Sequence, residues 1–164
     1  SLTTTTTRLS LVVNGLVVKR FLSEHWRNIM KFLFKAKDGG PESKVTGYWL
    51  IESKRWFSIA LLRFDEGSRE AFHTHAFNAI SWVLWGELLE YVRVDTGRVY
   101  TVSHYPSIFS IFTAKSRFHK VSGMAPVTWA LSFRGPWDKT WKEYLPAEDK
   151  HIILTNGRKV IVDG

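Results

Sequence analysis

The sequence contains no cysteine among its 164 residues. This absence excludes disulfide bonds, thiolate metal sites and a cysteine nucleophile. Long apolar runs are also missing, since none approaches the roughly 20 residues that a membrane-spanning helix needs. The first residues lack the charged and apolar regions of a signal peptide. We therefore expect a cytoplasmic protein with no membrane span.

Several enzyme motifs are absent as well. There is no Walker loop, no GxSxG elbow and no GxGxxG loop. The formal net charge is +8, which would suit nucleic acid, anionic lipid or an acidic small molecule as a partner. Because no helix-turn-helix or zinc-finger pattern is visible, we interpret the charge as that of a basic soluble protein. A nucleic-acid accessory role is kept as an alternative.

What the sequence does contain is a large apolar fraction, 45% of its residues, with eight tryptophans and eleven phenylalanines. This amount is enough for a well-filled core in a single domain over 1–164. Residues 1–8 are expected to be flexible. Ser23 can cap a helix over 23–37, in which Trp26, Met30 and Leu33 recur at helical spacing.

From residue 44 onward, short β-branched and aromatic runs alternate with turn residues, a pattern typical of a sandwich or barrel. A terminal hairpin is predicted over 150–163, because Asn156-Gly157 is a strong turn signal. The sequence therefore predicts a mainly β domain, with a barrel over 44–141 and a short N-terminal helix. The strands are expected at 47–51, 56–64, 71–77, 80–85, 88–94, 98–104, 107–112 and 127–133.

Two histidines, His73 and His75, are separated by one residue. In an extended strand, residues i and i+2 point to the same face, so their imidazoles would lie side by side. Imidazole is the commonest protein ligand for a transition metal. A third histidine on a neighbouring strand, for which His119 is the candidate, would complete a three-nitrogen face and leave open positions on the metal.

These residues resemble a known family. Gly67, His73, His75 and Gly86 match the first signature of the cupins, a superfamily of jelly-roll β-barrels. That signature normally adds a glutamate ligand after the second histidine, where this chain has Ala79 and Ile80. The second cupin signature supplies another histidine, and His119 fits its place, although the usual proline and glycine are replaced by Ala114 and Ser116.

Three histidines without a glutamate are similar to the cysteine dioxygenase branch of the cupins, which binds ferrous iron. The resemblance implies a divalent transition metal on His73, His75 and His119, with iron favoured over zinc, nickel or manganese. It further implies a small anionic substrate, an iron-dependent thiol dioxygenase activity, and a homodimer formed through edge strands. The alternatives are a non-catalytic cupin that binds a ligand or partner, and a cupin that has lost its metal.

Three further residues are candidates for contact with the substrate. Arg63 lies on the strand before the histidines and would pair with a substrate carboxylate if it faces inward. Asn78 would orient a ligand or cap the bend after the motif, and Trp82 would line the pocket or the core. No residue is assigned a catalytic role. His25, His104 and His151 have no partner motif and are interpreted as surface or core residues.

Overall fold

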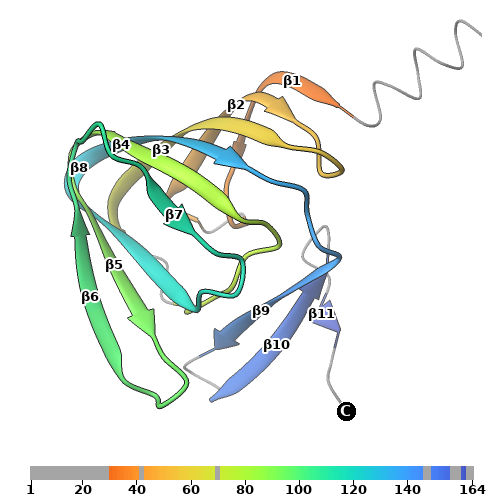
Figure 1. The fold of residues 1–164 in the computed structure, drawn as a ribbon, viewed down its shortest axis with the longest axis vertical. Helices are drawn as coiled ribbons and strands as arrows, with labels where there is room; N and C mark the ends of the chain where they lie inside the picture. The colour runs from red at the N-terminus through yellow and green to blue at the C-terminus, as the bar shows by residue number, and fades with distance from the viewer. Residues whose placement is uncertain (1–29, 41–42, 69–70, 146–148, 156–159, 162–164) are drawn as a thin grey trace, which may run out of the picture.

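A computed structural model describes residues 30–40, 43–68, 71–145, 149–155 and 160–161. Within these ranges every regular element is a strand, and the elements are numbered β1 to β11 along the chain (Figure 1). The expectation of a mainly β fold is therefore confirmed. The expected flexible segment 1–8 lies outside the described residues.

Most strands belong to one antiparallel sheet with the order β1-β2-β3-β8-β4-β7, from which β5 branches to pair with β8 and β6. Its edges β1 and β7 do not pair with each other, so among the described residues the sheet is open and the expected closed barrel is not formed. The strands are β1 (Lys31–Lys37), β2 (Val45–Glu52), β3 (Ser58–Ser68), β4 (Ala79–Trp85), β5 (Leu88–Arg93), β6 (Val99–His104), β7 (Ile111–Thr113) and β8 (His119–Arg134).

The long strand β8 organises this sheet. Its first residues pair with β5 and its last residues with β4, while β3 runs beside most of its length. Figure 1 shows β8 turning between these two parts, and the register on β3 shifts opposite Glu66 at the same region. The turn brings the start of β8, where His119 lies, into the space that the sheet curves around.

A second, three-stranded sheet contains β9 (Thr140–Leu145), β10 (Lys150–Thr155) and β11 (Val160–Ile161). The antiparallel pair of β10 and β11 agrees with the predicted terminal hairpin. β9 was not predicted from the sequence, because the adjacent charged residues Lys142 and Glu143 interrupt its apolar pattern and are unfavourable in strands.

The predicted helix over 23–37 is wrong for its second half, since Lys31–Lys37 forms β1; residues 23–29 lie outside the described part of the chain. The segment also fits a period of two, with Phe32, Phe34 and Ala36 on one side. Phe34 stacks on Trp49 of the paired strand β2, with ring centroids 5.9 Å apart. This tertiary contact overrides the helical spacing of the same apolar residues.

The buried face of β8 carries its small and polar residues, not its large apolar ones. Thr128, Ala130, Ser132 and Arg134 are buried, whereas the larger apolar residues between them lie on the opposite face. Phe133 is 41% exposed and contacts Trp82 on that outer face. Small and polar side chains on the inner face leave room for a cavity, which large aromatic residues would have filled.

Gly86 forms the turn between β4 and β5 with a φ of 82°. A Cβ at this position would lie 2.9 Å from both the Cα of Thr128 and the carbonyl oxygen of Val127. A left-handed backbone pressed against another strand accepts only glycine without strain. The glycine of the first motif therefore has a structural reason, because it allows β5 to fold back onto β8.

Candidate metal centre

The segment that carries His73 and His75 is held between two strands rather than within one. His73 exchanges two backbone hydrogen bonds with His119, at 2.9 and 3.0 Å. On the other side, the amide of Thr74 donates to the carbonyl oxygen of Lys142 in β9 at 2.9 Å. The predicted strand over 71–77 is thus reduced to isolated bridges at His73, but those bridges fix the segment beside the start of β8.

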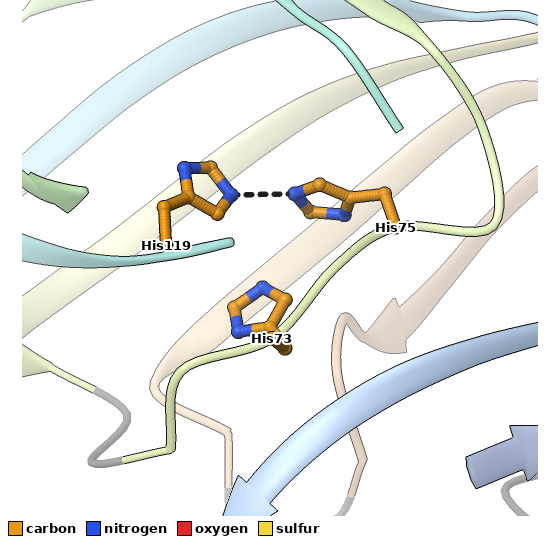
Figure 2. Close-up of side chains that lie close together, drawn as sticks. All are labelled: His73, His75 and His119. Carbon is orange, nitrogen blue, oxygen red and sulfur yellow. Dashed lines mark hydrogen bonds between the residues drawn. The ribbon is translucent and has the colours of Figure 1, made fainter. Parts of the chain in front are cut away.

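The three histidines converge in space (Figure 2). One ligand nitrogen from each of His73, His75 and His119 lies within 4.8 Å of the other two. The ring centroids are 4.9 to 5.3 Å apart. His119 is buried, with 4% of its surface exposed, and the other two are half-buried. The convergence expected from the sequence is therefore present, although no ladder of regular strand pairing produces it.

These distances fit a single metal ion. Nitrogens bound to one face of a first-row metal at about 2.1 Å lie roughly 3 Å from one another. The Nε2 atoms of His75 and His119 are 2.6 Å apart and share a hydrogen bond, so one proton lies between them. A bound cation would replace that proton and move the two rings slightly apart.

Hydrogen bonds orient two of the rings from behind. His73 places Nδ1 3.2 Å from the carbonyl oxygen of Ala71, and His119 places Nδ1 2.5 Å from Oε1 of Glu90. When each Nδ1 donates to these acceptors, Nε2 keeps its lone pair for a metal. A carboxylate behind a ligating imidazole also increases its basicity and fixes its tautomer.

Glu90 is the centre of a buried cluster. It lies on β5 with 2% of its surface exposed. Its two carboxylate oxygens accept hydrogen bonds from His104 on β6 at 2.9 Å, from Arg117 at 3.1 and 3.2 Å, and from His119. Three donors therefore compensate one buried carboxylate, which would otherwise be costly to desolvate.

The same contacts decide the ionisation of this carboxyl. Burial by itself raises the pKa of Glu90, but the hydrogen bonds from His104 and His119, with the charges of His119 and Arg117, outweigh it. The pKa consequently lies well below its ordinary value of 4.5. Glu90 is therefore an anion that holds His119 in place, and its oxygens are occupied by these donors.

A cavity of about 480 Å³ opens in front of the histidines. All three rings line it, as do Glu90 and His104. Most of its remaining wall is apolar. Besides Glu90, the charged residues among the lining are Lys37, Asp38, Glu52, Lys54 and Arg134.

Arg134 is the buried cation of this cavity. Its two Nη atoms donate to the two carboxylate oxygens of Asp38 at 3.1 and 2.5 Å. Its guanidinium also lies over the rings of Trp49 and Phe77, 4.9 and 4.7 Å from their centroids. Arg134 could not be singled out from sequence, because it shares a face of β8 with Thr128 and Ser132, opposite the large apolar residues, and that polar face is the buried one.

The three predicted substrate contacts lie away from this cavity, since none of them is among the residues that line it. Arg63 pairs with Asp65 at 3.0 Å on the surface. Asn78 is exposed, and its Oδ1 accepts from the amide of Lys115 at 2.8 Å, so it fixes the bend after the histidines. Trp82 donates through Nε1 to the carbonyl oxygen of Ile108 at 3.2 Å.

The position of the usual cupin glutamate is also visible. Ala79 is buried and lines the cavity, whereas Ile80 is 42% exposed on the outer face. A carboxylate at 79 would therefore face the same space as the histidines. With alanine at 79, the acidic residues near the histidines are Glu90, which is hydrogen-bonded to His119, and the buried Glu143, which is paired with His73 in an isolated bridge.

No family model matches the sequence, and no curated protein matches it either. Solved structures do share its fold. A sugar phosphate isomerase of the cupin superfamily from Silicibacter pomeroyi superposes with a TM-score of 0.54 and 13% identity, over 79% of this chain and 87% of that chain.

Two further structures are similar over a smaller share. A mutant of Bacillus subtilis oxalate decarboxylase gives a TM-score of 0.50 and 9% identity, over 66% of this chain and 29% of that chain. The iron(II) form of HppE in complex with substrate gives 0.50 and 15%, over 62% and 55%. At these identities the similarity establishes the fold, and the protein therefore has a cupin-type β-fold.

Of the residues that the structure describes, none belongs to a helix long and apolar enough to cross a membrane.

Proposed function

We propose that this protein is a metal-dependent enzyme acting on a small molecule, with His73, His75 and His119 as the ligands of a divalent transition metal. The observation that carries this proposal is the convergence of three imidazole nitrogens within 4.8 Å. Two of the rings are oriented by acceptors behind them. Histidines placed only for packing do not need this arrangement.

Iron is the metal we favour, with zinc, nickel and manganese as alternatives. Three neutral imidazoles leave the 2+ charge of the ion uncompensated, because Ala79 occupies the place of the glutamate. Such a centre prefers an anionic or chelating ligand, and it leaves open positions for that ligand and for a second molecule. A ferrous ion here would supply activation of dioxygen next to a bound substrate.

The specific reaction we propose is an iron-dependent dioxygenation of the thiol dioxygenase type. The support is the resemblance of the three-histidine motif to the cysteine dioxygenase branch. The fold neighbours HppE, in its iron(II) form with substrate, and oxalate decarboxylase are compatible with a metalloenzyme on this scaffold. Arg63, Asn78 and Trp82 stay predictions for substrate contact.

A second function has an observation in its favour. The Nε2 atoms of His75 and His119 already satisfy each other through a 2.6 Å hydrogen bond, and the cavity has an alanine where cupins usually have a carboxylate. A non-catalytic cupin that binds a ligand or a partner would need neither a metal nor that carboxylate.

Metal analysis of the purified protein, followed by oxygen uptake with a panel of thiols, distinguishes the two functions. The enzyme requires near-stoichiometric iron and thiol-dependent oxygen consumption. Zinc or no metal, with no turnover across the panel, would favour the binder. His119→Ala should abolish metal binding, whereas His151→Ala, an exposed histidine outside the cluster, should leave it unchanged.

A further inference from the structure

The walls of the cavity differ in character from its metal-binding end. Beyond the histidines and the Glu90 cluster, most of the lining is apolar, and much of it is aromatic. Its volume of about 480 Å³ falls within the roughly 300–1,000 Å³ of pockets that accept drug-sized ligands. The space therefore suits a molecule with a substantial apolar body. The aromatic lining residues are Phe34, Trp49, Phe64, Phe77, Trp137 and Trp141.

Part of this aromatic wall begins at the histidines themselves. The rings of His75 and Phe77 have centroids 5.2 Å apart. Phe77 in turn contacts Trp137 at 5.0 Å, and Trp137 contacts Trp141 at 6.2 Å. The part of a ligand that extends away from the three nitrogens would therefore contact a continuous row of aromatic rings.

The charged groups inside the cavity already have partners. Arg134 donates to both oxygens of Asp38 and lies over two aromatic rings. Glu90 accepts from three donors. Lys37 and Lys54 also line the cavity, but they are exposed residues. Among the described residues that line the cavity, no buried cation is left without a partner, so the positive charge available to an anion there would be that of a metal held by the three histidines.

We infer that the substrate is an organic acid that carries its oxidisable thiol on a large apolar body, aromatic or branched aliphatic. Its acidic chelating group binds at the three histidines, and its body lies against Phe77, Trp137 and Trp141. This inference rests on the proposed metal site and adds to it the class of substrate. An acid the size of an amino acid would leave most of the apolar wall uncovered.

A series of 2-hydroxy acids tests this inference, because glycolate, 2-hydroxyhexanoate and 3-phenyllactate share one chelating group and differ in the body. Binding is measured by isothermal titration calorimetry to protein loaded with Co²⁺, after its metal content has been determined. Affinity should rise from glycolate to 3-phenyllactate by roughly ten- to a hundredfold, the gain expected for burial of a phenylalanine-sized side chain.

Two variants test whether the gain in affinity comes from contact with the aromatic wall. Phe77→Leu should reduce the affinity for 3-phenyllactate by several-fold and leave glycolate unchanged. Phe112→Leu, at a position that is 58% exposed outside the cavity, should alter neither. Melting temperatures of both variants verify that they are folded.

The outcomes distinguish failure of the inferred substrate class from failure of the proposed metal site. Equal affinities across the series in metal-loaded protein would overturn the inference and leave the metal site intact. Failure to bind any metal would overturn the proposed function, and the inference with it. An unchanged preference in folded Phe77→Leu would show that the aromatic wall is not where the body binds.

Discussion

Replacing Glu90 with glutamine should weaken the metal site by changing the tautomer of a ligand. The carboxylate accepts from His119 on one oxygen and from His104 on the other, while Arg117 reaches both. An amide has one oxygen and one NH₂ group, so it can accept from one of the two histidines and must present a donor to the other.

The larger consequence falls on His119. If the amide NH₂ faces it, Nδ1 must accept, and the proton moves to Nε2, where it blocks the metal. If the oxygen faces it instead, His104 is mismatched, and His119 still loses the negative charge behind it. Loss of such an orienting partner lowers metal affinity by about 10- to 100-fold. Removing one member of a buried charged cluster also destabilises the fold by about 3–5 kcal/mol.

Competition with a chromophoric chelator measures the metal affinity of Glu90→Gln, and urea denaturation measures its free energy of unfolding. Glu66→Gln is the matched control, since Glu66 is exposed. A folded Glu90→Gln protein that binds metal within twofold of the wild type would refute the role assigned to this carboxylate.

Three other predictions concern stability. Because the pKa of Glu90 is lowered in the folded protein, its ionised form stabilises the fold above pH 4.5, and this contribution is lost as the pH falls further. Between about pH 5 and 3, the free energy of unfolding of Glu90→Gln should therefore decrease less than that of the wild type. Arg134→Ala should cost about 3–5 kcal/mol in urea denaturation, because it removes a buried guanidinium that pairs with Asp38 and lies over two aromatic rings. Arg63→Ala removes a partly exposed ion pair and should cost under about 1 kcal/mol. Gly86→Ala should lower the free energy of unfolding by about 1–3 kcal/mol, because position 86 has a positive φ and lies against the backbone of β8. A melting temperature equal to that of the wild type would contradict this reason.

The closeness of His73 and His75 could be predicted from sequence because it depends on local spacing. His73 and His75 project together whether the segment is a regular strand or a bridged loop, since both are extended. His119 was assigned to the same cluster by its resemblance to the histidine of the second cupin signature, and the structure brings it beside the pair. The convergence of the three histidines could therefore be predicted from local spacing and a motif together, even where the secondary structure around them was predicted wrongly.

The surroundings of the site could not be predicted in the same way. The roles of Glu90, Arg117 and His104 depend on which strands become neighbours, and that order is set by the turn in β8 and the fold of β5 onto it. Similarly, the spacing of apolar residues in β1 predicts a helix, because a local pattern carries no information about its pairing with β2. The outer placement of Phe133 has the same cause, as alternation identifies two faces of a strand but not which one faces the cavity.

The alanine at position 79 offers the strongest test of the charge argument. Ala79 is buried and lines the same cavity as the three histidines. Ala79→Glu should therefore introduce a carboxylate that can complete a fourth ligand position. Without metal, the new carboxylate would be buried opposite Arg134, whose guanidinium is already bonded to Asp38. Incomplete compensation of the buried charge should therefore lower the free energy of unfolding by up to about 2 kcal/mol.

With metal, the same substitution should have the opposite effect. Attraction between a 2+ ion and an adjacent carboxylate amounts to several kcal/mol even at an effective dielectric constant of about 20, so the metal affinity should rise by at least about tenfold and recover the lost stability. Anionic ligands should then bind more weakly, because the ion is partly neutralised. Ala79→Gln, which adds the same bulk without charge, controls for filling the cavity. If metal affinity and anion affinity are unchanged by Ala79→Glu, the uncompensated charge cannot be what draws an acid into this site.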